Sequence, residues 1–317
     1  MTQTPSTTGS FNRLQSGDLF VATDSDGKTY KVPYSRVDDI IKPLPSIIHI
    51  RNIRNGFVEV TDHDYITDLS GNRVSDTRFT AGEYLIYGDT AIFTESTANW
   101  DFGSLTNTIK RKNFHNFLKF CHNFNGDISH LRIDAAEDTS YMFSDCDVFN
   151  QPVTHFDTSK VNTMRAMFKQ CHKFNQPVNH FITSACENFQ IMFSHAFEFN
   201  QPLDNWDVDH SITFLEMFNT TSFAQDISGW DVSRAMNMQG MFRECPFNAD
   251  ISGWNTKNVT NMDYMFYQNK QFSQDLTKWC VPNFSRTGPY SFAYGATNFP
   301  YTLWPKWGTC PRGEDKE

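Results

Sequence analysis

The sequence lacks long apolar runs and has no excess of positive charge. None of its 317 residues lies in a run of 18 or more consecutive apolar residues, so no membrane-spanning helix and no membrane insertion are expected. The 27 Lys and Arg are outnumbered by 36 Asp and Glu, which gives a net charge of −9. Because a basic surface is needed to neutralise phosphates, nucleic acid is not expected as a partner.

The chain also lacks sequence signs of export and of catalysis. Residues 1–10 are polar and uncharged, whereas a secretory signal needs basic residues followed by an apolar stretch. The seven Cys form an odd number without any C-x-x-C pair, so we expect them to be mostly reduced. No nucleophile elbow, phosphate loop, H-E-x-x-H or paired-cysteine ligand motif occurs. We therefore expect no enzyme and no cofactor.

Phenylalanine, by contrast, is abundant, with 30 residues, and it recurs at a fixed period. A Met-Phe pair appears six times at steps of 24 or 25 residues, a second aromatic follows it, and a Phe or Trp closes the unit. With a degenerate unit near 117–128, seven units run from about 114 to 285. The repeated core positions are Phe143, Phe168, Phe193, Phe218, Phe242 and Phe266, closed in the later units by Trp206, Trp230, Trp254 and Trp279.

Each unit is predicted to contain a short helix and a short strand. Apolar residues from Val161 to Cys171 recur at the spacing of one helix face. The segment 149–156 contains Pro152 and is too short for another helix, so it is predicted to be extended. Such a unit cannot bury its aromatic face alone and must stack on its neighbours. The sequence therefore predicts an α/β solenoid, a leucine-rich-repeat-like stack with ladders of Phe, Trp and Cys inside.

The pattern V-x-x-M-x-x-M-F…F-N-Q-P/D-I/V-x-x-W-D resembles the repeat of the BspA-like leucine-rich repeat surface proteins, which is common in mycoplasma lipoproteins. The resemblance covers about 170 of the 317 residues. It extends to a worn eighth unit at 292–299 and to a terminal cap at 304–311. Ile182, Cys186 and Ser211 depart from the family pattern. The resemblance implies a solenoid used for adhesion or protein interaction, with no catalytic residues to carry over.

The first 103 residues do not repeat. Segments 19–22 and 28–32 are predicted strands around a tight turn, 43–45 is a predicted linker, and 47–50, 57–60 and 83–87 are further strand candidates. Segment 17–39 resembles the openings of virion structural proteins of tailed phages, especially cyanophages. The predicted divisions are an arm with a β-hairpin for docking (1–45), a small β-rich domain or N-terminal cap (46–103), the repeat solenoid (104–285), and a degenerate repeat with a C-terminal cap (286–317).

Two polar clusters near the N-terminus are candidate metal sites. Asp24, Asp26 and Gly27 match a third of a calcium loop without its distal Glu, so a turn is favoured. The segment 62–64, Asp-His-Asp, is a candidate ligand cluster, but an exposed polar loop is the simpler interpretation.

Two columns of polar residues run through the repeats. His130, His155 and His180 would line up on one edge of the stack, about 5 Å apart. Such a row could hold a divalent metal or sense pH, or it could simply reflect duplication of the repeat. The Asn column is predicted to satisfy backbone groups at the strand edge and not to bind a ligand; it comprises Asn125, Asn150, Asn175, Asn200 and Asn248.

These features lead to three hypotheses of function. The first is a non-enzymatic virion protein of a tailed phage, assembled in the host cytoplasm in multiple copies. It would dock to other virion proteins through residues 1–45 and use its solenoid for protein interaction or for adhesion to a host receptor or glycan. The second is a bacterial cell-surface adhesin of the BspA-like type. The third is a glycan-binding protein, because exposed Trp and Asp near strand ends suit sugars.

Overall fold

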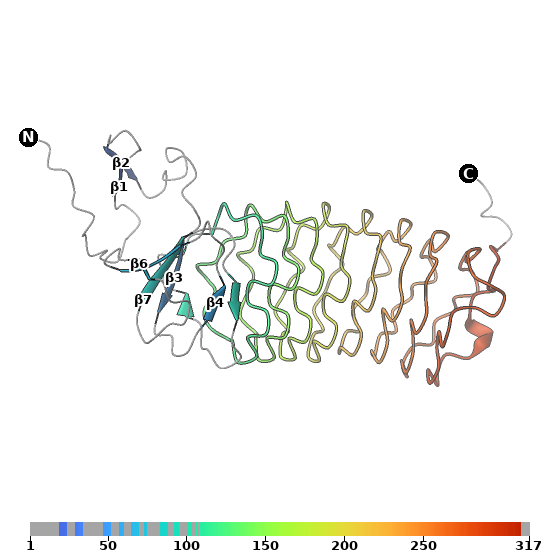
Figure 1. Cartoon of the computed structure of the whole chain (residues 1–317). Helices are drawn as coiled ribbons and strands as arrows, with labels where there is room; N and C mark the ends of the chain where they lie inside the picture. The colour runs from blue at the N-terminus through green and yellow to red at the C-terminus, as the bar shows by residue number, and fades with distance from the viewer. Residues whose placement is uncertain are drawn as a thin grey trace, which may run out of the picture.

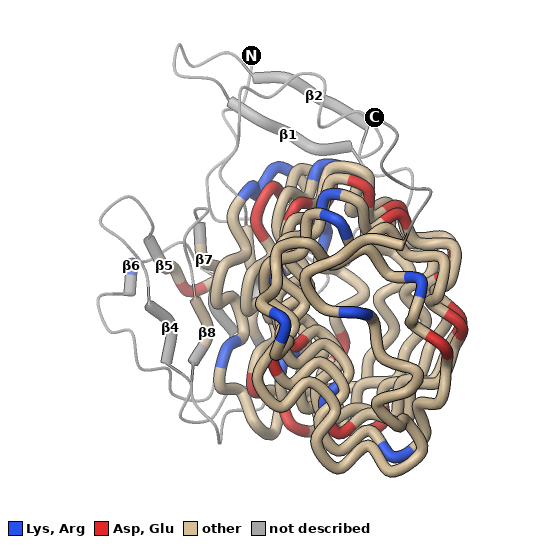
Figure 2. Tube along the Cα trace, turned by 90° about the vertical axis from the view of Figure 1, so that its right-hand side faces the viewer, with Lys and Arg blue, Asp and Glu red and all other residues tan. Residues whose placement is uncertain are grey.

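The computed structural model describes residues 108–311 without interruption, together with Thr106, Leu69 and the N-terminal strands named below. Figure 1 shows a small strand region followed by a long row of coils that lie side by side. Figure 2 looks along this row and shows the coils behind one another, with charged residues distributed around their outer turns. We call residues 113–299 the coil stack.

The described strands of the N-terminal region all pair antiparallel. β1 (Leu19–Thr23) pairs with β2 (Thr29–Pro33) as a hairpin. A five-stranded sheet has the order β6-β5-β7-β3-β9, and β4 pairs with β8. The bounds of these strands are β3 Ile47–Arg51, β4 Phe57–Glu59, β5 Tyr65–Asp68, β6 Arg73–Val74, β7 Glu83–Tyr87, β8 Ile92–Thr94 and β9 Asp101–Phe102. The calcium-loop candidate, the linker and the 62–64 cluster lie outside the described residues.

The strand region joins the coil stack through β8. Phe93 N donates to Phe117 O at 2.8 Å, and the two rings are 5.1 Å apart. Phe102 from β9 lies against both rings, at 5.3 and 5.9 Å. All three side chains are buried, so the first coil is covered by aromatic residues of the preceding strands and not by solvent.

Successive coils are connected by single parallel bridges at a constant position. The bridged residues are 24 or 25 apart in sequence, which is the period of the Met-Phe pairs. They are Asn113, Asp138, Thr163, Asn188, Thr213, Asn237 and Asn261. The bridges lie before each Met-Phe pair and not in the segments predicted to be extended, such as 149–156, which form irregular structure and turns.

The predicted helix between Val161 and Cys171 is not formed; the chain makes consecutive turns there. Ala166 and Gln170 have φ values of 55° and 56°, in the left-handed region that a right-handed helix does not contain. A helix would direct its N–H groups to carbonyls of its own segment. The turns instead send alternate N–H groups to the next coil, which gives neighbouring coils backbone partners.

The same alternation repeats in every coil. Tyr141 N and Phe143 N donate to Arg165 O and Met167 O of the next coil, at 2.8 and 3.0 Å. Between them in the sequence, other N–H groups close turns within the coil, as Ser144 N does on Tyr141 O at 3.1 Å. We call these stretches the turn ladder; they comprise residues 114–120, 139–145, 164–170, 189–195, 214–220, 238–244 and 262–268.

Aromatic rings fill the interior as two neighbouring columns. In the first, Phe143, Phe168 and Phe193 are spaced 5.7 and 5.8 Å apart with nearly parallel planes. In the second, Phe149 and Phe174 are 5.8 Å apart, and Phe149 is 4.3 Å from Phe143. These side chains are 0% exposed, and each contributes about 1.5–3 kcal/mol through burial. The core is therefore continuous from one coil to the next.

Asparagine side chains replace backbone pairing at one corner of the coils. Asn150 N and Asn175 N donate to the side-chain oxygens of Asn125 and Asn150, at 2.8 and 3.0 Å. The Gln176 side chain also donates to Asn150 O at 3.0 Å. The prediction that the Asn column satisfies backbone groups is confirmed at these positions.

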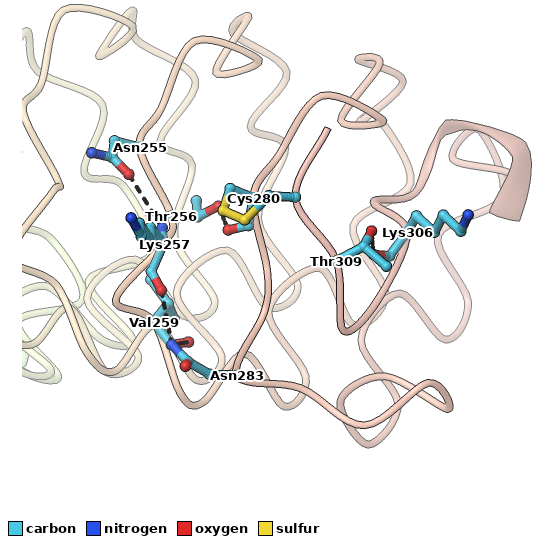
Figure 3. The surroundings of a disulfide bond; sticks show 9 residues. Asn255, Thr256, Lys257, Val259, Cys280, Asn283, Lys306 and Thr309 are labelled. Carbon is cyan, nitrogen blue, oxygen red and sulfur yellow. Dashed lines mark hydrogen bonds between the residues drawn. A yellow bond between two sulfur atoms is a disulfide. The ribbon is translucent and has the colours of Figure 1, made fainter. Parts of the chain in front are cut away.

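The last regular coil is covered by the C-terminal segment. Leu276 N donates to Leu303 O and Val281 N to Thr309 O, both at 2.9 Å, next to the 3-10 helix η2 (Tyr301–Leu303). Cys280 and Cys310 form a disulfide between the coil and this segment, as Figure 3 shows around Cys280. Five other cysteines are free and buried. The sequence predicted mostly reduced cysteines but did not indicate this pair.

Candidate binding surface

The core positions singled out in the sequence lie inside the coil stack. The six Met-Phe phenylalanines are 0% exposed, and the four closing tryptophans are 1–4% exposed. Trp206 Nε1 donates to Val178 O at 3.0 Å, and Trp230 Nε1 to Leu203 O at 3.0 Å. The tryptophans therefore cannot present ring faces to a sugar, which removes the observation on which the glycan hypothesis was based.

The histidine column uses its nitrogens on the backbone. Nε2 of His155 lies 3.0 Å from Ile128 O, and Nε2 of His180 lies 3.1 Å from Val153 O. Because a carbonyl oxygen only accepts, Nε2 carries the proton in both bonds. Burial lowers the pKa of His155. His130 is partly exposed. Among the described residues, no group of three or more His, Cys, Asp or Glu is placed to hold a metal ion.

The free thiols are buried and hydrogen-bonded. Cys146 Sγ and Cys171 Sγ donate to Leu118 O and Phe143 O, both at 3.0 Å. Burial raises the pKa of Cys171 well above its usual range, and raises that of Cys186 to about 12. Since the thiolate is the reactive form, these groups are unsuited to nucleophilic or redox chemistry.

The outer side of the turn ladder carries exposed aromatic residues at its C-terminal end. We define the tyrosine cluster as Arg243, Tyr264, Tyr267, Tyr290 and Tyr294. The Tyr267 and Tyr294 rings stack at 5.6 Å, and the Tyr264 and Tyr290 rings meet edge to face at 5.3 Å. The Arg243 guanidinium lies 5.0 Å from the Tyr267 ring centre. Tyr290 and Tyr294 are 67% and 64% exposed.

Backbone hydrogen bonds of the turn ladder connect the two coils that carry this cluster. Tyr264 N donates to Tyr290 O at 3.0 Å, and Gln268 N donates to Tyr294 O at 2.8 Å. Desolvation, with a smaller effect of Tyr290, raises the pKa of the Tyr264 phenol, so its hydroxyl stays protonated at neutral pH. The half-buried rings of Tyr264 and Tyr267 and the exposed rings of Tyr290 and Tyr294 are therefore attached to a firmly bonded backbone.

A groove of about 560 Å³ opens beside the cluster, between two neighbouring coils. Its charged and amide side chains are one carboxylate, two amides and one ammonium group. The lining residues are Glu244, Cys245, Pro246, Tyr267, Gln268, Lys270 and Gln271. A Cβ on Gly295 would lie only 2.5 Å from Gln268 Nε2, so glycine at this position leaves room for the Gln268 amide.

A second, smaller groove of about 400 Å³ is acidic. Asp226 and Asp250 line it, but each carboxylate accepts the N–H two residues later, from Ser228 and Ser252, at 2.8 and 2.9 Å. These carboxylates stabilise turns, and this bonding lowers their pKa values. The acidic side chains of this groove are therefore explained by the turns that they stabilise.

A smaller aromatic group lies at the N-terminal end of the turn ladder. Lys119 Nζ is 4.6 Å from the centre of the Tyr141 ring and 4.7 Å from that of Phe120. The Arg165 guanidinium lies 5.4 Å from the Tyr141 ring centre, and Phe120 is 49% exposed. Both ends of the ladder thus combine exposed aromatic rings with cations.

Sequence reasoning missed the tyrosine cluster. Its residues occupy positions that vary from coil to coil, so they are absent from the repeat consensus. The available signal was the spacing: Tyr264 and Tyr290 are 26 residues apart, and Tyr267 and Tyr294 are 27 apart. These steps are close to the repeat period and place the paired tyrosines next to each other on successive coils.

Comparison with known proteins identifies the repeat tract. Two overlapping stretches, residues 112–223 and 212–304, match the family described as Mycoplasma protein of unknown function, DUF285. Neither curated proteins nor solved structures give a match. In the part of the chain that the structure describes, no helix is long and apolar enough to cross a bilayer. Since the matched stretches span more than half of its length, the chain belongs to the DUF285 family, which in general terms is the BspA-like repeat family.

Proposed function

We propose that this chain is a non-enzymatic binding protein whose coil stack serves protein interaction or adhesion. The observation that carries the proposal is the tyrosine cluster, in which Tyr290 and Tyr294 are more than half exposed and Arg243 lies over the Tyr267 ring. Tyr and Arg are enriched in binding hot spots. Rigid support lowers the entropic cost of binding, and the turn ladder supplies that support.

The proposed setting is a tailed-phage particle, with several copies docked to other virion proteins through residues 1–45. Support for this setting comes from the resemblance of segment 17–39 to phage virion proteins. The alternative setting is the bacterial cell surface, which the BspA-like repeat favours. Mass spectrometry of purified particles, and fractionation of uninfected cells, separate the two. Detection in particles alone supports the virion setting, and detection on uninfected cell envelopes supports the adhesin.

The binding role is tested with the purified full-length chain, fluorescently labelled, on intact host cells. We expect saturable binding that is weakened at least tenfold by the double substitution Tyr290→Ala and Tyr294→Ala. Tyr301→Ala is the matched control, because Tyr301 is 80% exposed and lies in η2, outside the cluster. Equal binding by the double variant and the control would contradict a role for the cluster, and absence of saturable binding would contradict the adhesion role.

A further inference from the structure

We infer that the tyrosine cluster and its adjoining groove form a binding site for an uncharged glycan. The inference rests on the proposed binding function and names the chemical class of the ligand. The groove volume, about 560 Å³, is within the range of small-ligand sites. Tyr267 belongs to both the cluster and the groove, so one ligand can contact both.

The aromatic side of the site offers ring surface for the C–H faces of a sugar. Tyr294 is 64% exposed, and Tyr267 stacks on one of its faces at 5.6 Å. Among the described residues, no second ring contacts Tyr294, and the exposure of this side chain leaves much of its surface accessible to a ligand ring. Tyr290, 67% exposed, extends this surface along the coil. A flat apolar surface with a hydroxyl at its rim suits a ligand that is apolar on its faces and polar around its edge.

The polar side of the site suits hydroxyl groups. The Gln268 and Gln271 amides each provide donors and an acceptor, Glu244 accepts, and Lys270 donates. A sugar hydroxyl both donates and accepts, so vicinal hydroxyls can bond to such mixed pairs. The Gln268 amide lies over Gly295, where any Cβ would meet it, so the glycine lets this polar group pack in the wall of the groove.

The charges of the site argue against a charged polymer. Arg243 Nε lies 3.3 Å from Glu244 Oε1, so these two charges compensate each other. Asp263 lies next to Tyr264 and accepts Tyr290 N at 2.7 Å, which places another negative charge near the cluster. Among the described residues that line the groove, Lys270 is the one with a positive charge. With charges of both signs present, neither a polyanion nor a polycation gains a net attraction.

The test is isothermal titration of the full-length chain with cellohexaose, maltoheptaose, chitohexaose and mannohexaose, and with heparin as the anionic comparison. We expect at least one neutral oligosaccharide to bind with a dissociation constant below about 10 mM. Tyr294→Ala and Gln268→Leu should each weaken that binding about tenfold or more, while Tyr301→Ala should leave it unchanged. Far-ultraviolet circular dichroism of each variant confirms that it folds.

Three results would overturn the inference. They are failure of all four neutral oligosaccharides to bind, binding that the Tyr294 and Gln268 variants do not weaken, and binding of heparin alone. If the titrations overturn the glycan assignment but the unsubstituted chain binds host cells, and this binding depends on Tyr290 and Tyr294, the proposed function stands and the partner is a protein. If the unsubstituted chain does not bind host cells either, the proposed function fails together with the glycan assignment.

Discussion

His180 and Trp206 satisfy equivalent backbone carbonyls on adjacent coils. His180 Nε2 lies 3.1 Å from Val153 O, and Trp206 Nε1 lies 3.0 Å from Val178 O. In the coil with His180 the next residue is Phe181, whose ring has no donor; in the coil with Trp206 the donor is on the closing ring itself. The pairs His-Phe and Asn-Trp are therefore alternative solutions to one hydrogen-bonding requirement, which explains why the histidine column ends where the tryptophans begin.

Trp206→Phe is expected to destabilise the chain by roughly 2–3 kcal/mol, because Val178 O loses its donor in a buried position and part of the ring volume is removed. The measurement is the free energy of unfolding in guanidinium chloride. Adding Asn205→His to this variant recreates the His-Phe pair and should recover about 1 kcal/mol. The control is Asn205→His alone, which should be near neutral because position 205 is exposed. No recovery in the double variant would contradict the equivalence.

The repeat period of the fold can be predicted from the sequence, but the local backbone conformation cannot. Residues of one column contact each other, so Met-Phe, Asn and Trp recur at the spacing of the coils. The spacing of apolar residues from Val161 to Cys171 also fits a helix, and nothing in it signals the turn ladder. The left-handed positions carry residues such as Tyr141, Asp145 and Ile191, which do not mark such conformations as glycine does.

The tyrosine cluster could not be predicted for a different reason. A repeat consensus keeps the residues that face the core and averages out those on the surface. The residues of the tyrosine cluster belong to the variable positions, so the consensus hides them. The disulfide partner Cys310 lies outside the repeats, in a segment that has no equivalent column for comparison.

His195→Asn is expected to make the stability of the chain less dependent on pH. Burial lowers the pKa of His195 in the folded chain, whereas the unfolded side chain titrates near about 6.5. As the pH falls below that value, the unfolded chain binds more protons and the free energy of unfolding decreases. Asn cannot titrate, and it tolerates the φ of 60° found at this position. Unfolding curves between about pH 8 and pH 5 should be flatter for the variant; equal slopes would contradict this account.

Gly240→Ala is expected to cost about 1–2 kcal/mol. Gly240 has a φ of 60°, and a Cβ there would lie 2.9 Å from Glu216 Cγ. The matched control is Gly253→Ala, because nothing lies within 4 Å of a Cβ at that position. Thermal unfolding of both variants checks the prediction, which would be wrong if the two changes had the same effect.

Reduction of the Cys280–Cys310 disulfide is expected to loosen the C-terminal segment first. The bond spans 30 residues, and closing a loop of this size contributes about 3–4 kcal/mol in the chain-entropy treatment. The segment is otherwise held by a few backbone bonds, such as Val281 N to Thr309 O, and by Trp307, whose ring is 4.9 Å from that of Phe292. Dithiothreitol should therefore lower the melting temperature and speed hydrogen exchange at Val281 and Gly308, while amides of the central coils change little. Cys310→Ser should show the same behaviour without reductant and no further response to it. If reductant leaves exchange at Val281 unchanged, the disulfide does not hold the segment in place.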